Sequence, residues 1–385
     1  MKKTPKGHEG ARLDKSIVGG AAGALPLTTV TTLAAAVLLL AAGASTVRAQ
    51  SSVTLSGVVD AAARHVSNEG LGSVKSMVSG ANSTSRLVVR GTEDLGGGLS
   101  AGFHLEHGIA LDTGSGTGTG FWDRRSTLSL ASRTLGELRL GRDYVPSYLG
   151  WNRFDPFSYV GVAGSNNLVS GTPVGPIRSG FGTGANSTVR ASNSVGYFTP
   201  AGLGGFEGQA MVSAGEGATS ANGGHKVIGA RVGYAAGPVV VSVAHTTSET
   251  ELTSAGKFGD SVVGGSWILG PARLHAAWRQ FKQNASKQTN VMLAGSVTLG
   301  VTELKASVVR ANLSGRVGAT VVDANDAQQV GLGAVYNLSK RTALYGTASQ
   351  ISNDGAATFV VPGGPAGLAG GRSSRGIEAG VRHVF

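Results

Sequence analysis

Apolar and polar residues alternate with a period of two through most of this chain. In residues 86–92, for example, Leu87 and Val89 fall on one side of an extended chain, whereas Arg86 and Arg90 fall on the other. Successive side chains of a β-strand point to opposite faces, so the pattern predicts strands with one apolar and one polar face.

Sixteen such segments follow one another, separated by clusters of Gly, Asn, Asp and Ser. They are expected to begin near Val53, Thr84, Leu99, Phe121, Leu135, Arg190, Gly205, His225, Pro238, Phe258, Pro271, Thr289, Val301, Gln328, Lys340 and Arg375. Short and long connections broadly alternate, and the longest covers residues 144–189. Tight turns at one rim and long loops at the other are typical of membrane barrels. The pattern therefore predicts an all-β fold, a 16-stranded antiparallel transmembrane β-barrel.

The first 49 residues follow a different pattern. Basic residues precede an uncharged stretch whose apolar centre runs from Leu33 to Ala44, and Val47 and Ala49 supply small residues before a cleavage point. This order is typical of a secretory signal peptide, and the apolar centre is shorter than the about 20 residues of a spanning helix. We expect residues 1–49 to be a signal peptide and residues 50–385 to form the barrel; the alternative is a membrane anchor.

Composition excludes several kinds of function. The chain has no cysteine, which excludes a disulfide scaffold, a cysteine zinc site and a cysteine nucleophile. Its eight histidines show no metal-ligand spacing, and no serine lies in a nucleophile elbow. We expect no enzymatic activity, no metal and no cofactor. The net charge of +11 is spread thinly among the strands, which, with the signal pattern, argues against a nucleic-acid partner.

Six short motifs occur in order along the chain. They are Ser51–Asp60 at the first strand, Arg90-Gly-Thr-Glu-Asp-Leu-Gly-Gly-Gly-Leu99, Leu140-Gly-Arg-Asp143, Asn193-Ser-Val-Gly-Tyr197, Asn337-Leu-Ser-Lys-Arg-Thr342 and Gly380-Val-Arg-His-Val-Phe385. Together they resemble the trimeric general porins of Gram-negative outer membranes, most closely those of Burkholderia- and Bordetella-like organisms.

The resemblance implies a function as well as a fold. It implies a homotrimer in the outer membrane, in contact with lipid and lipopolysaccharide and exported through the periplasm. Each barrel would hold a water-filled channel for passive diffusion of ions and small hydrophilic solutes, with the third loop folded into the lumen. The terminal Phe385 would act as an assembly signal.

Basic residues are expected at the narrowest point of the channel. The resemblance places Arg86, Arg125 and Arg190 in a ladder on the channel wall, and strand parity also puts them on the polar face. Arg124 falls on the apolar side of its strand, so we expect it at an interface rather than in the pore.

Acidic residues are expected to face this ladder. Glu106 matches a polar-face acid of the third strand, Asp155 is the remaining acid of the loop, and Arg153 adds a positive charge beside it. The glutamate usual in the family's loop is absent from Asp155-Pro-Phe-Ser-Tyr159. Three or four arginines against two acids predict a weak to moderate preference for anions, reduced by salt.

Other functions remain open on the sequence alone. A substrate-preferring channel would need an aromatic or charged binding track, which the pattern does not exclude. A barrel enzyme, an adhesin and a soluble secreted β-protein are further alternatives, although the chain shows no acid/base cluster and no repeat domain.

Overall fold

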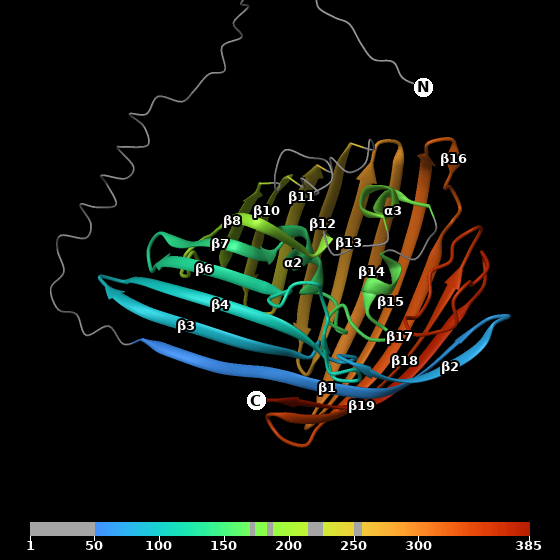
Figure 1. Ribbon diagram of the computed structural model, residues 1–385, viewed down its shortest axis with the longest axis horizontal. Coiled ribbons are helices and arrows are strands. Elements are labelled where there is room, and N and C mark those ends of the chain that lie inside the picture. The colour runs from blue at the N-terminus through green and yellow to red at the C-terminus, as the bar shows by residue number, and fades with distance from the viewer. Residues whose placement is uncertain (1–50, 170–173, 183–187, 215–225, 250–255) are drawn as a thin grey trace, which may run out of the picture. The chain divides into compact units, whose positions relative to one another are not determined.

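A computed structural model of the protein describes residues 51–169, 174–182, 188–214, 226–249 and 256–385 (Figure 1). The expected signal peptide, residues 1–49, lies outside the described residues. The chain divides into two units, Met1–Arg48 and Ala49–Phe385, and the described residues belong to the second. None of the helices in these ranges is long and apolar enough to cross a membrane.

Strands make up most of the described chain. The long ones are β1 (Ser52–Asn68), β3 (Arg86–Gly96), β4 (Leu99–Ala110), β6 (Arg125–Ser132), β7 (Gly136–Tyr144), β8 (Arg190–Phe198), β9 (Phe206–Ser213), β10 (Lys226–Ala236), β11 (Val239–Glu249), β12 (Lys257–Leu269), β13 (Ala272–Gln283), β14 (Ser286–Leu299), β15 (Thr302–Val317), β17 (Ala327–Asn337), β18 (Thr342–Asn353) and β19 (Ser374–Val384). Three shorter strands are β2 (Gly72–Ser79), β5 (Ser115–Gly116) and β16 (Thr320–Val321).

The long strands close into an antiparallel barrel. Each pairs with the next along the chain, and the last, β19, returns to β1 from Val58↔Val384 to Asn68↔Ser374. The prediction of a 16-stranded antiparallel barrel is confirmed for the described part of the chain. The predicted strand starts lie within four residues of the observed ones, and the largest difference separates Phe121 from Arg125.

The connection after the first strand contains structure that the pattern did not predict. Strand β2 lies between the predicted strands that begin near Val53 and Thr84, where no further strand was expected. It pairs with the second half of β1, from Ala61↔Ser79 to Asn68↔Gly72, while the first half of β1 pairs with β3. The hairpin forms because β1 continues for 17 residues, beyond the point where its pairing with β3 ends.

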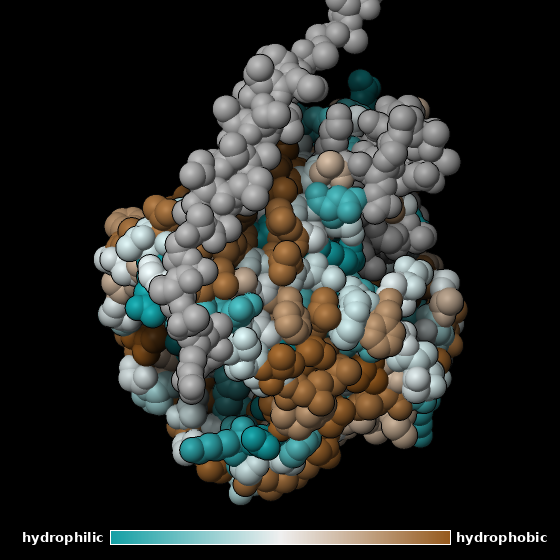
Figure 2. Space-filling model, turned by 60° about the vertical axis from the view of Figure 1, so that its left-hand side comes forward, coloured by the Kyte–Doolittle hydropathy of each residue, from teal (hydrophilic) through white to brown (hydrophobic). Residues whose placement is uncertain are grey.

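Most of the long strands have one buried face and one exposed face. On β12, Phe258, Asp260 and Val262 are buried, whereas Val263 and Trp267 are 48% and 53% exposed. The exposed positions of most strands are apolar, and Figure 2 shows apolar side chains gathered in a broad area of the outer surface. An apolar exterior around a polar interior matches a barrel whose outer face contacts lipid.

The connection between β7 and β8 packs against the buried face of the barrel strands. It contains helix α2 (Pro146–Asn152), a 3₁₀ helix (Ser165–Leu168) and helix α3 (Pro176–Phe181). Both α-helices begin with proline, whose fixed φ suits the first helical position. Helix α2 contacts strands β9 to β12, the 3₁₀ helix contacts β15 and β17, and α3 contacts β13 and β14 (Figure 1).

Glycines on the strands make room for this connection. A Cβ atom at Gly264 would lie 2.4 Å from the Phe154 ring, and one at Gly333 would lie 2.8 Å from the Phe157 ring. Since real Cβ atoms do not approach other atoms so closely, these two strand positions require glycine while the aromatic rings stay in place.

Candidate functional site

Glu106 joins two arginines on the buried face of the barrel. The register pairs Glu106 of β4 with Val88 of β3 on one side and with Arg125 of β6 on the other. Arg124 Nε donates a hydrogen bond to Glu106 Oε1 at 2.5 Å, and Arg86 Nε lies 3.6 Å from the same oxygen. The structure therefore brings Arg86 and Glu106 together, as the resemblance implied.

Arg124 belongs to this group, so its expected place at an outer interface is wrong. Its guanidinium is mostly buried and also donates to the Tyr144 hydroxyl at 3.2 Å. The parity argument failed because β6 begins at Arg125. Arg124 precedes the strand, where side chains no longer alternate strictly between the two faces.

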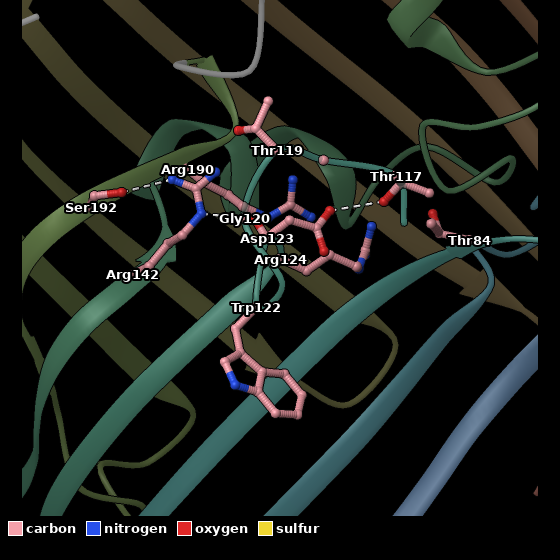
Figure 3. A pocket seen from close by; sticks show the side chains of 11 residues that line it. Thr84, Thr117, Thr119, Gly120, Trp122, Asp123, Arg124, Arg142, Arg190 and Ser192 are labelled. Atoms are coloured by element: carbon pink, nitrogen blue, oxygen red, sulfur yellow. Dashed lines mark hydrogen bonds between the residues drawn. The ribbon is translucent and has the colours of Figure 1, made fainter. Parts of the chain in front are cut away.

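Arg190 and Arg142 extend the cluster around Tyr144. Arg190 Nη2 donates to the Tyr144 hydroxyl at 3.2 Å, and its guanidinium lies 4.6 Å from the centre of the Tyr144 ring. Arg142 donates to the Asp123 backbone oxygen at 2.8 Å and to Ser192 Oγ at 2.9 Å. Figure 3 shows the guanidinium groups of Arg142 and Arg190 close together at the cavity edge.

Arg190 belongs to the cluster, but strand parity, which predicted its position, is not the reason. Strand parity assumed regular alternation along β8, but the register shifts between Gly141 and Asp143 of the neighbouring strand. Asn193 also has a positive φ of 52°. Arg190 therefore pairs with Tyr144 at the strand end, and it joins the cluster through this pairing rather than through the alternation of β8.

A cavity of about 440 Å³ lies beside these side chains. Its lining includes Arg124, Arg142 and Arg190, together with Asp123 and Trp122 of the preceding loop. Within the described residues, Arg142 and Arg190 donate hydrogen bonds to neutral groups. The Asp123 carboxylate therefore balances only part of the positive charge that the three arginines bring to the cavity lining.

Arg125 lies in a second charged group on the same face. Arg125 Nε lies 3.5 Å from Asp143 Oδ1 and donates to Thr127 Oγ1 at 3.2 Å. Arg139 Nη1 lies 3.2 Å from Asp143 Oδ2 and also bonds Glu137. Arg125 thus faces the interior as predicted by parity, but its carboxylate partner is Asp143, which the sequence interpretation did not select.

Asp155 does not face the basic ladder, and this expectation is corrected. Its carboxylate accepts hydrogen bonds from the backbone of Phe157 at 2.8 Å, Tyr159 at 3.2 Å and Ser165 at 3.0 Å, and from Ser165 Oγ at 2.5 Å. Burial raises the pKa of the Asp155 carboxyl, and these hydrogen bonds act in the opposite direction. The side chain fixes the turn of its own loop because all four donors surround it.

Arg153 also lies away from the main cluster. Its guanidinium pairs with Glu207 of β9, which Arg231 of β10 contacts at 2.6 Å. Arg153 and Asp155 both line a second cavity of about 500 Å³, near the short turn at Gly270. The structure therefore separates Arg153 from Arg86, Arg125 and Arg190 instead of placing it beside them.

A buried ion pair holds the connection between β7 and β8 against the strands. Asp260 accepts hydrogen bonds from Arg279 Nε at 2.9 Å, from Arg279 Nη2 at 2.7 Å and from Ser147 Oγ at 2.7 Å. Arg279 Nη1 also donates to the Tyr159 hydroxyl at 3.4 Å. The Arg279 and Asp260 side chains are 0% and 3% exposed, so the pair is shielded from water.

The terminal Phe385 completes the pairing of the first strand. Its backbone N donates to the Gly57 oxygen at 3.1 Å and its oxygen accepts from Gly57 N at 3.0 Å. A Cβ atom at Gly57 would lie 2.5 Å from the Phe385 ring. The last residue is therefore part of the barrel closure.

The apolar outer face, the polar interior and the interior arginine cluster define a membrane-spanning barrel channel. Comparison with known proteins identifies the family. The model for Gram-negative porins matches residues 34–356, which is most of the chain. Outer membrane porin protein 32 of Delftia acidovorans is 36% identical over 358 residues, covering 89% of this chain and 97% of the relative.

Solved structures agree with this result. The anion-selective porin from Comamonas acidovorans is 35% identical, with a TM-score of 0.74, and the match covers 87% of this chain and all of that one. OmpT of Vibrio cholerae has the same fold, with a TM-score of 0.60 over 87% of this chain and 98% of OmpT at 14% identity. The chain belongs to the Gram-negative porin family. It is an outer-membrane diffusion channel for ions and small hydrophilic solutes rather than an enzyme.

Proposed function

We propose that this porin prefers anions and that the arginines around Tyr144 and Glu106 set the preference. The proposal rests on one observation, which is that the positive charge of this cluster is only partly neutralised. Glu106 is shared between Arg86 and Arg124, while Arg142 and Arg190 bond neutral groups in the described part of the chain.

The third loop is proposed to narrow the channel beside these arginines. Its helix α2 follows directly after Tyr144, and Tyr148 of α2 stacks on the Tyr144 ring at a centroid distance of 5.2 Å. The loop thereby connects the arginine cluster to strand β12, where Ser147 donates a hydrogen bond to Asp260. A narrow, water-filled passage strengthens the effect of fixed charges on passing ions.

The size of the preference follows from the potential in the narrow region. A mean positive potential with an energy of about one RT per unit charge would raise the chloride concentration about 2.7-fold and lower the potassium concentration about 2.7-fold. The ratio of chloride to potassium in the narrow region would then be about 7. A porin of similar sequence, from Comamonas acidovorans, is described as anion-selective, which supports the sign of this preference.

Single-channel recording of the refolded protein across a KCl gradient tests the proposal. The wild type should give a chloride-favouring reversal potential, and the double variant Arg142→Gln with Arg190→Gln should at least halve the permeability ratio. Lys257→Gln with Arg310→Gln is the matched control, because both side chains are exposed on the outer face. Potassium preference in the wild type would contradict the proposal.

The assembly and export of the porin complete the proposal. Residues 1–49 act as a signal peptide, and three copies associate as the family resemblance implies.

An apolar concavity of about 840 Å³ on the outer face suits contact with another copy. It is lined by Ala63, Met77, Ile377 and Val381 of β1, β2 and β19. Phe385 serves as the assembly signal, which is supported by its pairing with Gly57.

A further inference from the structure

Asp60 is a buried carboxylate on the inner face of β1 that binds the turn between β2 and β3. The residue is 0% exposed. Its Oδ1 accepts hydrogen bonds from the Tyr345 hydroxyl at 2.5 Å and from the Ala81 backbone at 3.3 Å. Its Oδ2 accepts from the backbone of Asn82 at 3.1 Å and of Ser83 at 2.7 Å. Three consecutive N–H groups of the turn therefore converge on one carboxylate.

The main chain of Asp60 holds both ends of the same turn. Its oxygen accepts from Gly80 N at 2.8 Å and from Ser85 Oγ at 3.0 Å, and its N–H donates to Ser85 Oγ at 3.0 Å. On the other side, Gly161 of the third loop lies so close to the Ala81 carbonyl oxygen that no Cβ atom fits there. The turn is therefore fixed between β1 and the third loop.

The turn in its place carries the groups that hold Arg86. Arg86 Nη1 donates to the Thr84 backbone oxygen at 2.7 Å and to Ser83 Oγ at 3.3 Å, while its Nε lies 3.6 Å from Glu106. Figure 3 shows Thr84 among the side chains that line the cavity of the arginine cluster. The position of the Arg86 guanidinium therefore depends on the turn that Asp60 binds.

The chemistry of these contacts requires a carboxylate. Among the described residues Asp60 forms no ion pair, whereas Glu378 of the neighbouring β19 pairs with Arg64 at 2.6 Å. Both oxygens of an ionised carboxylate accept hydrogen bonds, whereas an amide offers one oxygen and an NH₂ group that only donates. With asparagine at this position, either the donors at Oδ1 or those at Oδ2 would lose their acceptor.

We propose that Asp60 is a positioning residue for ion selectivity, which holds the turn between β2 and β3 so that Arg86 keeps its charge in the narrow passage. The inference rests on the proposed anion preference. As a charge alone, Asp60 would lower that preference, because a carboxylate on the channel wall repels chloride. As a positioning residue it raises the preference, because Arg86 stays in place. The two roles predict opposite results when the charge is removed.

The size of the effect follows from the charge of the cluster. Four arginines against two carboxylates, Glu106 and Asp123, leave a net charge of +2. If Arg86 no longer presents its charge there, the net charge and the potential fall by half. A chloride-to-potassium ratio of about 7 would then fall to about 3.

Reversal potentials of the refolded Asp60→Asn variant across a KCl gradient test the proposal. The ratio should fall to about 3, although a negative charge has been removed. An unchanged or increased ratio would overturn the proposal. The matched control is Asp323→Asn, which also removes a carboxylate that accepts from a loop backbone N–H, that of Gly315. The control should leave the ratio unchanged, and an equal fall there would also overturn the proposal.

A double-mutant cycle tests whether Asp60 acts through Arg86. Arg86→Gln alone should lower the ratio to about 3, and adding Asp60→Asn should lower it no further. Independent effects would instead add in the logarithm of the ratio, and such a further fall would overturn the proposal. A purely structural role would lower the yield of folded barrels without this dependence on Arg86.

Ser85→Ala provides a test without any change of charge if Asp60→Asn does not refold. It removes the hydroxyl that joins the turn to the Asp60 main chain, so the ratio should fall by less than twofold. An unchanged ratio would overturn the proposal. Potassium preference in the wild type would contradict the proposed function, while the cycle would still show whether Arg86 depends on Asp60. Chloride preference in the wild type with an unchanged Asp60→Asn would overturn only this inference.

Discussion

The ion pair between Asp260 and Arg279 is predicted to fix the third loop in place. Replacing Asp260 by asparagine leaves the Arg279 guanidinium buried without its counter-charge. Breaking a buried pair in this way typically costs about 3–5 kcal/mol. We expect the lower end, about 3 kcal/mol, because asparagine retains an oxygen that can still accept at least one of the three hydrogen bonds from Arg279 and Ser147.

The effect should extend from stability to conduction. Ser147 donates to Asp260 and Tyr159 accepts from Arg279, so both ends of residues 147–159 depend on the pair. In Asp260→Asn we expect this segment to leave the wall transiently. Planar-bilayer recordings should then show conductance fluctuations that the wild type lacks, and urea unfolding followed by tryptophan fluorescence should give the lost stability.

A double-mutant cycle decides whether the buried charge is the cause. Asp260→Asn combined with Arg279→Gln removes both charges and should recover most of the stability that the single variant loses. The control is Lys257→Gln, which breaks an exposed pair with Glu249 and should cost less than about 1 kcal/mol. A single variant within about 0.5 kcal/mol of the wild type, or a double variant less stable than the single one, would refute the reasoning.

Three other predictions concern selectivity and assembly. Tyr144→Phe removes the hydroxyl that Arg124 and Arg190 contact, so it should lower the chloride preference in a KCl gradient less than removal of a charge does; an unchanged reversal potential would count against the role of the hydroxyl. Raising the salt from 0.1 M to 1 M shortens the Debye length from about 10 Å to about 3 Å, so the chloride preference should fall, and a constant preference would contradict an electrostatic origin. Deleting Phe385 removes two backbone hydrogen bonds to Gly57 and should reduce the yield of folded barrels on refolding; full yield would exclude its role in assembly.

The barrel wall could be predicted from the sequence because alternation is a local property. Leu87 and Val89 face outward from β3 for the same reason that Arg86 faces inward: neighbouring residues of a strand point to opposite sides. The argument fails where the strand is irregular. Arg124 precedes its strand, and the register shift beside β8 breaks the parity that was extended to Arg190.

The packing of the third loop could not be predicted in this way. The sequence shows glycine at positions 264 and 333 but not why glycine is needed there. The need arises because the rings of Phe154 and Phe157, from a segment far away in sequence, pack against these two positions. The anchoring pair of Asp260 and Arg279 is likewise formed across two strands. Both residues lie on the buried faces of their strands, but alternation alone does not reveal that a loop covers them.

The charge of the channel shows why residue types alone misjudge selectivity. Asp155 was counted as an acid facing the arginines, yet its carboxylate binds donors of its own loop. Arg124 and Arg142 were left out of the ladder, yet both line the cavity with Arg190. The cluster therefore has one acid fewer than the sequence interpretation assigned, and Arg124 and Arg142 stand in it where Arg125 and Arg153 were expected. If Asp143 and Asp123 do not offset this change, the measured chloride preference should exceed the weak to moderate value expected from the sequence. A weak preference would show that those two carboxylates dominate the field.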